Sequence, residues 1–484
     1  MTSEKVSYNG TDNSGVITPP QTSSMAESGV DLAYEKKIIR KVDLRLLPIL
    51  AALYSVSLID RANMAGAAIA GMMADLKLNI GSRYSIVLLV FFIPYFIFEL
   101  PSNLVLRRVG SAVWLSSIAF SWGVVTIGMG FIEDWRIMVF CRVLLGFFES
   151  GFLPGCVYLI CSWYVRYEVQ QRLAGFYLFT TLVGGFSSIM VYWLTKMNGI
   201  QGLAGWRWIF IIEGVITVAI AFLAYIFVID FPDKLLQRRK PFLTDSEVDI
   251  IKSRINRDRD DSQADPITWS IVVHHLADWK LWVYALMFMN GAVPPYALAY
   301  FLPIILKGMG YSTGMSQILS ALPYIPAVVV GFTLAWWADK SRLRAPFIAL
   351  GALLVIAGLS MTAFSSHHSV RYFGVFVCLA GAQNNVPAVL AYQANNIRMN
   401  SKRSVGTALQ IGFGAIGGVF ASTVFREKDA PGYRNGLWAT IGTQFLTLLL
   451  LVCMTIYFKK KNRQHKESTL DKPLENHPEF TYTI

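Results

Sequence analysis

Long apolar segments separated by short charged ones constrain this sequence more than any other feature. A helix needs about 20 apolar residues to cross the hydrocarbon core of a bilayer, so twelve such helices would take roughly 240 residues. That is about half of the 484 residues, of which only 15% are charged. The pattern predicts an all-α membrane protein and excludes a secreted, disordered or nucleic-acid-binding chain.

The apolar runs form two groups of six on either side of a charged stretch. The first group lies at about 46–70, 84–106, 112–131, 137–161, 173–195 and 207–229. The second group lies at about 281–306, 316–338, 346–364, 372–395, 405–425 and 437–458. We therefore expect twelve transmembrane helices in two six-helix halves, residues 45–229 and 281–458. The remaining parts are a disordered N-terminal tail at 1–44, a central loop at 230–280 and a C-terminal tail at 459–484.

The placement of Lys and Arg predicts the orientation, because basic loops stay on the cytoplasmic side. With both termini inside, 31 of the 43 Lys and Arg residues lie on the cytoplasmic side, ten lie on the opposite side and two lie within spans. The formal net charge of +12 thus reflects membrane topology and not a nucleic-acid partner. Both termini are predicted to be cytoplasmic, and the plasma membrane is the default location for an uptake protein.

The central loop contains a helix signal, whereas the sequence contains no signal for an enzyme. Thr244 and Glu247 match a capping box, which predicts a helix at about 245–257 with Val248, Ile251 and Ile255 facing inward. The five Cys and six His residues have no spacing typical of disulfides or metal ligands. No P-loop and no nucleophile–base pair is evident, so we expect no catalysis, cofactor or metal.

Ionisable residues inside spans are functional candidates, because burying a charge in the hydrocarbon core is costly. Asp60 and Arg61 interrupt the first span. Counting about 1.5 Å per residue places Arg61 and Arg142, from the first and fourth spans, at a similar depth. Two guanidinium groups at one level can clamp an anion, and pairing with Asp60 or Glu149 is the structural alternative.

Glu149 shares a helical face with Arg142 and Gly146, because the three residues are spaced i, i+4 and i+7. Burial favours the protonated form of a carboxyl group, and a nearby cation favours the ionised form. A glutamate that meets water and arginine in turn can take up and release a proton. The alternative is a fixed ion pair that holds helices together.

Other buried polar residues divide into structural candidates and possible ligand contacts. Glu99 lies near the inner surface, where pairing with basic residues is expected, and Glu213 is expected to pair across helices. The remaining candidates are amides and phenols that either orient a polar ligand or join helices: Asn290, Tyr296, Gln383 and Asn384.

The two groups of six spans resemble the major facilitator superfamily, and short motifs carry the resemblance further. Arg142-Val-Leu-Leu-Gly146 is similar to the span-four motif of that superfamily. Ala335-Trp-Trp-Ala-Asp339-Lys340 with Arg342 and Arg344 is similar to its loop motif between spans eight and nine, although Ala335 stands where Gly is usual. The resemblance implies a gating or structural role for Asp339 and Arg342. The corresponding loop after span two departs from the acidic form of the motif, with Arg107-Arg108 following Pro101-Ser102-Asn103.

Several further blocks resemble the anion:cation symporter family, in particular its fungal organic-acid and vitamin permeases. They are Asp60-Arg61-Ala62-Asn63, Gly146-Phe-Phe-Glu149-Ser-Gly-Phe-Leu-Pro154-Gly155, Trp206-Arg-Trp-Ile-Phe-Ile-Ile-Glu213-Gly214 and Phe301-Leu-Pro303. The resemblance covers about residues 40–460. It implies contacts of Arg61 and Arg142 with an anionic substrate and proton coupling at Glu149, with Asp60 beside it.

We therefore expect a monomeric secondary transporter that takes up a small organic anion together with protons through the lipid bilayer. Nicotinate, another vitamin acid or carboxylate, an allantoate-like ureide and a short peptide all fit two arginines and a set of amides. An exporter of a secondary metabolite or drug on the same scaffold is the nearest alternative. A nutrient receptor that binds without transport is a more remote one.

Overall fold

The computed structural model describes residues 23–232, 242–259, 269–426, 429, 432–467, 473–476 and 480–484. Residues 1–22 of the predicted tail, 233–241 and 260–268 of the predicted loop, and parts of the C-terminal tail lie outside this description. The chain forms two units, residues 1–44 and 45–484. Every regular element among the described residues is a helix.

The first group of helices precedes the central loop. It consists of α1 (Ser23–Ala67), η1 (Ala68–Met72), α2 (Met73–Asp75), α3 (Arg83–Val109), α4 (Ser111–Met129), α5 (Trp135–Glu149), α6 (Phe152–Trp163), α7 (Arg166–Thr195), η2 (Ile200–Gly202) and α8 (Gly205–Phe227). Because α1 begins at Ser23, the second part of the predicted N-terminal tail is helical and not irregular.

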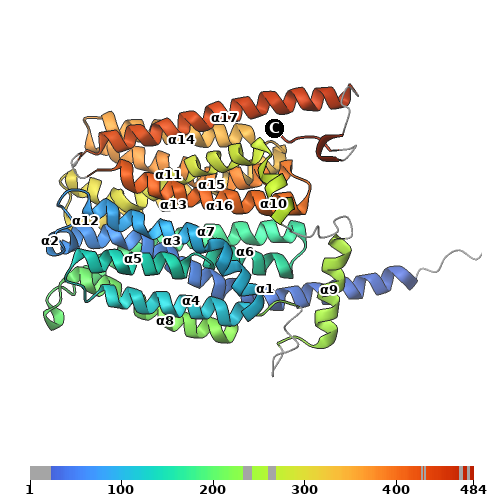
Figure 1. Cartoon of the computed structure of the whole chain (residues 1–484), viewed down its shortest axis with the longest axis horizontal. Coiled ribbons are helices and arrows are strands. Elements are labelled where there is room, and N and C mark those ends of the chain that lie inside the picture. Colours follow the sequence, from blue (N-terminus) through green and yellow to red (C-terminus); the bar gives the residue numbers. More distant parts are fainter. Residues whose placement is uncertain are drawn as a thin grey trace, which may run out of the picture. The chain divides into compact units, whose positions relative to one another are not determined.

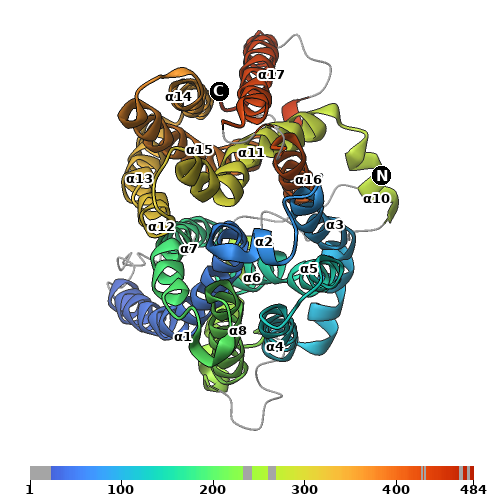
Figure 2. The ribbon, with the colours of Figure 1, turned by 90° about the vertical axis from the view of Figure 1, so that its left-hand side faces the viewer.

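The second group follows the loop helices α9 (Asp245–Arg259) and α10 (Trp269–Leu276). It consists of α11 (Trp279–Gly308), α12 (Thr313–Ala321), α13 (Tyr324–Ser341), α14 (Ala345–Phe364), α15 (His368–Asn396), α16 (Asn400–Val424), α17 (Arg434–Lys466) and η5 (Leu474–Asn476). In the side view of Figure 1 the long helices run nearly parallel to one another. Figure 2, which looks along them, shows α3 to α8 gathered on one side and α11 to α17 on the other.

Length and composition single out eleven stretches of the described helices as able to cross a membrane. The helix α3 is 27 residues long and occupies the place of the second predicted span, although it is not one of the eleven. All twelve predicted spans therefore coincide with helices. The molecule is an all-α membrane protein with two six-helix halves.

The polarity of the molecule is that of a protein surrounded by lipid. Phe140, Phe222 and Ile456 are each about 60% exposed, while Arg142 and Glu213 are each 1% exposed. Large exposed apolar side chains face a solvent as apolar as themselves, and the charged groups are enclosed by the bundle.

The predicted fourth span is interrupted, which the sequence analysis did not anticipate. Helix α5 ends at Glu149 and α6 begins at Phe152. A Cβ atom on Gly151 would lie 1.6 Å from the Ser102 hydroxyl oxygen, so this position admits only glycine while α3 packs so closely. The break places Glu149 at the last residue of α5.

The predicted helix of the central loop is confirmed. Thr244 N–H donates to Glu247 Oε2 at 3.0 Å, and Glu247 N–H donates to Thr244 Oγ1 at 3.4 Å, which is the reciprocal pattern of a capping box. Val248, Ile251 and Ile255 are buried, as predicted from their spacing.

Candidate functional site

An ion pair between α1 and α5 lies at the centre of the candidate site. Arg61 donates to Glu149 Oε1 through Nε at 3.1 Å and through Nη2 at 2.5 Å. The Ser57 hydroxyl donates to the same carboxylate oxygen. Arg61 is 6% exposed and Glu149 is 2% exposed, so the loss of either partner would leave a buried charge without its counterion.

Arg142 lies against the same aromatic ring as Arg61. The guanidinium carbons of Arg61 and Arg142 are 5.5 and 4.8 Å from the centroid of the Phe91 ring, which α3 supplies. Arg142 Nε donates to the Val87 carbonyl at 3.3 Å. Its Nη2 atom is buried and has no hydrogen-bond partner among the described residues. Arg142 therefore keeps an unused donor in a buried site.

The C-terminal half contributes polar groups from α11 to the same region. Arg61 Nη1 donates to the Tyr296 hydroxyl at 3.3 Å, which joins the two halves directly. Asn290 is fully buried, and neither its side-chain oxygen nor its side-chain nitrogen has a partner among the described residues. The buried Tyr300 hydroxyl also lacks one. Buried polar groups are normally satisfied, so these groups indicate a place for water or a ligand.

A pair of carboxyl groups lies beside the arginines in the N-terminal half. Asp60 and Glu213 lie close enough to interact electrostatically, and they are 6% and 1% exposed. Trp122 Nε1 donates to Asp60 Oδ2, and Asn63 Nδ2 donates to Glu213 Oε2. Two neighbouring buried carboxyl groups repel each other when both are ionised, which favours a proton on one of them. Glu213 thus pairs across helices with Asn63 of α1 and lies beside another acid.

The two predicted amides of α15 have different environments. The Tyr177 hydroxyl donates to Gln383 Oε1 at 3.5 Å, so this amide faces α7 of the other half. Asn384 Nδ2 donates to the Phe347 carbonyl at 2.9 Å and thus joins α15 to α14. Each amide could either contact a ligand or join two helices. Asn384 joins two helices of its own half, whereas Gln383 faces the other half.

Glu99, Asp339 and Arg342 lie nearer the helix ends, and Glu99 differs from its sequence expectation. The expected pairing of Glu99 with basic residues is not present among the described residues, where its buried Oε2 has no hydrogen-bond partner. Asp339 of the loop motif pairs with Arg344. Arg342 caps the end of α13 in the left-handed conformation, with φ 54°, which directs the chain toward α14.

Sequence reasoning missed several partners of the charged residues. Ser57 lies one turn before Arg61 on the same helical face, and this spacing could have identified it. Trp122 and Phe91 stand in apolar runs without any distinguishing neighbour, so no sequence signal marks them. Among the described residues, no group of three His, Cys, Asp or Glu side chains is arranged to hold a metal ion.

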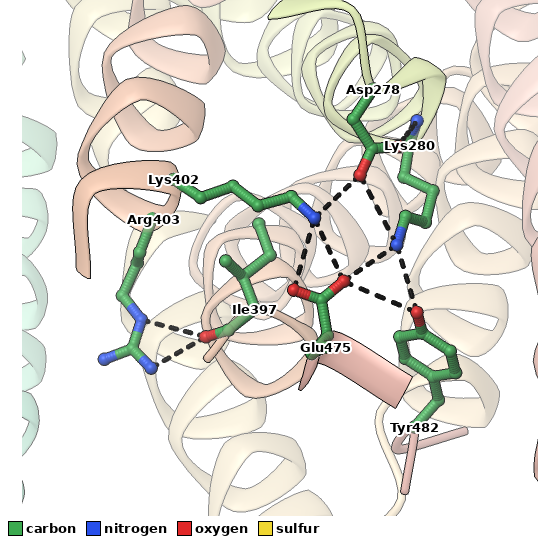
Figure 3. A network of polar contacts seen from close by, with 7 residues as sticks. All are labelled: Asp278, Lys280, Ile397, Lys402, Arg403, Glu475 and Tyr482. Carbon is green, nitrogen blue, oxygen red and sulfur yellow. Dashed lines mark hydrogen bonds and ion pairs between the residues drawn. The ribbon is translucent and has the colours of Figure 1, made fainter. Parts of the chain in front are cut away.

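A second polar cluster joins the C-terminal segment to the ends of α11 and α16 (Figure 3). Lys402 Nζ lies 2.7 Å from Asp278 Oδ2 and 3.0 Å from Glu475 Oε1. Lys280 Nζ lies 2.9 Å from Glu475 Oε1 and donates to the Tyr482 hydroxyl at 3.0 Å. A pocket of about 430 Å³ opens beside the cluster. Because both lysines already contact carboxylates, the cluster anchors the chain and does not present a free cation.

The lysines determine the ionisation of this cluster. Burial opposes the charged form of Asp278 and Glu475, but the hydrogen bonds and charges of Lys280 and Lys402 outweigh it. The pKa of each carboxyl group is therefore held below its ordinary value. Burial raises the pKa of Tyr482 despite the neighbouring Lys280, so its hydroxyl stays protonated.

The geometry of the bundle agrees with the comparisons with known proteins. A family model described as Major Facilitator Superfamily matches residues 50–422. The chain belongs to this superfamily. The MFS-type transporter cnsO of Penicillium expansum is 31% identical over 443 residues, which cover 90% of this chain and 85% of that protein. The high-affinity nicotinic acid transporter of Saccharomyces cerevisiae is 26% identical over 494 residues, covering 99% of this chain and 89% of that protein.

Solved structures of the superfamily share the fold. The proton:xylose symporter XylE bound to 6-bromo-6-deoxy-D-glucose superposes with a TM-score of 0.67, covering 88% of this chain and 96% of that chain. The identity is 15%, so the likeness concerns the fold alone. The present chain is therefore a multi-pass membrane transporter of this superfamily.

Proposed function

We propose that this transporter carries a small organic anion across the membrane together with protons, and that Arg142 is the principal contact of the anion. The observation that carries the proposal is the buried Nη2 atom of Arg142, which has no partner among the described residues. A guanidinium group is always charged, and leaving one of its donors unsatisfied in a buried site is costly. A carboxylate would satisfy that donor and balance the charge.

Arg61 and Glu149 form the exchangeable part of this site. In the ion pair, Glu149 occupies the Arg61 donors that an anion would need. Protonation of Glu149 removes the charge of the competitor and lets the anion take its place beside Arg61. Binding shifts the equilibrium between the two access states only through a difference in affinity, and this exchange supplies such a difference.

The opposite wall of the proposed site comes from α11 and α15. Tyr296 already contacts Arg61, Asn290 has both amide atoms available, and Gln383 faces α7. These groups would orient a polar ring attached to the carboxylate. Asn384 is left out of the proposed site because its amide bonds to α14.

The Asp60–Glu213 pair is the proposed second location of a proton. Repulsion between the two buried carboxylates favours one shared proton, and Asp60 directly precedes Arg61 in the chain. A movement of Arg61 would therefore be transmitted directly to Asp60 along α1. Glu149 and this pair together give the transporter two groups whose protonation can follow the substrate.

The substrate class follows from the residues and from the relatives. The resemblance to the anion:cation symporter family and the name of the Saccharomyces cerevisiae relative favour nicotinate or a similar carboxylate. We further propose a monomer in the plasma membrane with both termini in the cytoplasm, as the distribution of Lys and Arg indicates. Export remains the alternative direction on the same scaffold.

Uptake into proteoliposomes tests the proposal. Purified protein is reconstituted, a pH gradient is imposed, and the accumulation of labelled nicotinate and other small carboxylates is followed. We expect accumulation that collapses when a protonophore removes the gradient. No gradient-dependent flux of any carboxylate in either direction would overturn the proposal, and efflux of preloaded substrate against its gradient would establish export.

A further inference from the structure

Two side chains of the C-terminal half bond to main-chain carbonyls at the end of the first span. Lys307, near the end of α11, donates through Nζ to the Ile69 carbonyl at 2.8 Å. Gln317, in α12, donates through Nε2 to the Gly66 carbonyl at 3.2 Å. Both bonds connect the two halves at the same end of the bundle, which the predicted topology places outside the cell.

The Ile69 carbonyl is available because the helix changes its winding at this point. The segment η1 is a π-helix, in which the Met73 N–H bonds to the Ala68 carbonyl. In an α-helix the same N–H would bond to the Ile69 carbonyl. Gly71 adopts φ 121°, a conformation that other residues rarely take, and it ends the regular winding. The irregular helix end thus exposes an acceptor to the other half.

Glycines let the elements of the two halves approach closely at this end. A Cβ atom on Gly66 would lie 2.7 Å from Val191 Cγ1 and 3.0 Å from Gln317 Nε2. A Cβ atom on Gly314 of α12 would lie 2.6 Å from the Tyr192 ring of α7. A pocket of about 320 Å³ lies between the halves here, lined by residues that include Ile69, Tyr192 and Thr313. This end of the molecule is therefore closed.

We propose that Lys307 and Gln317 are gate residues, whose bonds to the carbonyls at the end of α1 hold this side of the transporter shut. The proposal rests on the transport function inferred above. Lys307 is exposed, so water can replace its bond when the gate opens, and the gate is reversible. Gln317 is 1% exposed, so it opens only when α12 moves away from α1. Lys307 is thus the solvent-exposed part of the gate, and Gln317 is its buried part.

Distance measurements between spin labels on Ile200 of η2 and Met315 of α12 test the gate. Both residues are about half exposed and belong to different halves at this end. The Lys307→Met variant removes the donor and keeps the length of the side chain. Lys77→Met is the matched control, because Lys77 is an exposed lysine at the same end, in the turn after α2, and does not line the pocket between the halves.

We expect Lys307→Met to raise the ratio of long to short distances about tenfold, since hydrogen bonds of charged groups contribute enough for such a change. Lys77→Met should leave the ratio unchanged, and Gln317→Leu should raise it. An unchanged ratio in Lys307→Met, or an equal rise in Lys77→Met, would overturn the proposal. The measurement needs neither substrate nor a pH gradient, so its failure is separate from a failure of the proposed anion transport.

Discussion

Arg61 and Arg142 lie against the same aromatic ring, yet only Arg61 is hydrogen-bonded to a carboxylate among the described residues. Both guanidinium groups lie near the Phe91 ring, Glu149 accepts two bonds from Arg61, and one donor of Arg142 has no partner among the described residues. In the proposed mechanism this asymmetry gives the two arginines different roles. Arg142 would bind the incoming anion, and Arg61 would become available to it when Glu149 is protonated.

Replacement of Glu149 by Gln separates coupling from binding. The amide introduced by Glu149→Gln cannot ionise, so a proton gradient could no longer drive accumulation, while exchange of labelled for unlabelled substrate should continue. Parallel assays of gradient-driven uptake and counterflow in proteoliposomes measure both. Accumulation at the wild-type level in Glu149→Gln would contradict the coupling role.

If the Asp60–Glu213 pair takes part in proton coupling, its loss should change the pH dependence of transport. Glu213→Gln keeps a hydrogen-bond donor and acceptor but removes one titrating group, so uptake should depend less steeply on external pH. Rates measured across a pH series for wild type and Glu213→Gln give this slope. Glu133→Gln changes an exposed residue of the α4–α5 loop and serves as the control. Equal slopes in wild type and Glu213→Gln would remove the pair from the coupling scheme.

Gly146 provides a stability test of the packing that positions the site. A Cβ atom there would lie 2.0 Å from the Phe91 carbonyl oxygen, so Gly146→Ala must push α5 away from α3. Such overpacking costs about 1–3 kcal/mol, and thermal unfolding of the detergent-solubilised protein should shift downward. Gly175→Ala is the matched control, because a Cβ atom at Gly175 would meet no atom within 4 Å. A melting temperature equal to that of Gly175→Ala would show that the helices can adjust.

The C-terminal cluster predicts a pH-dependent attachment of the last residues. Tyr482 N–H donates to Asn462 Oδ1 at 2.9 Å, and Thr483 N–H donates to Asn396 Oδ1 at 2.8 Å. The lowered pKa values of Asp278 and Glu475 mean that their pairing stabilises the attached state above the ordinary carboxyl pKa of about 4. This stabilisation is lost as the pH falls through the folded-state values.

Hydrogen exchange of the 480–484 amides measures this attachment. Protection factors should fall on acidification in the wild type, and Glu475→Gln should already have low protection at neutral pH. The control is Glu467→Gln, which alters an exposed ion pair with Arg463. Full protection in Glu475→Gln would mean that the apolar contacts of the segment hold it alone.

The sequence predicts the spans and the buried charges because both depend on composition and on a constant rise per residue. The similar depth of Arg61 and Arg142 follows from that rise, and both lie on Phe91. The partner of Glu149 does not follow from it. Spacing along α5 favours Arg142, whereas the packing of α1 against α5 brings Arg61 to the carboxylate.

Other features depend on contacts between distant parts of the chain. The break after Glu149 arises where Gly151 meets Ser102 of α3, and the Asp60–Glu213 pair forms where α1 meets α8. The sequence predicts a tail after α17, yet the Tyr482 ring stacks on the Phe458 ring, with their centroids 4.3 Å apart. No local pattern distinguishes such contacts from solvent exposure.

Direct binding of carboxylates to purified protein tests the central claim about Arg142. Titration calorimetry with nicotinate and with its uncharged amide compares two ligands that differ in the anionic group. The proteins compared are the wild type, Arg142→Ala, Arg142→Lys and Arg136→Ala, in which an exposed arginine is replaced as the control. We predict that nicotinate binds to the wild type and that its amide does not. Arg142→Ala should weaken nicotinate binding at least tenfold. Arg142→Lys should restore only part of the affinity, because lysine lacks the forked donors of a guanidinium group. If a carboxylate binds to Arg142→Ala as tightly as to Arg136→Ala, the anion does not meet Arg142 and the account is contradicted.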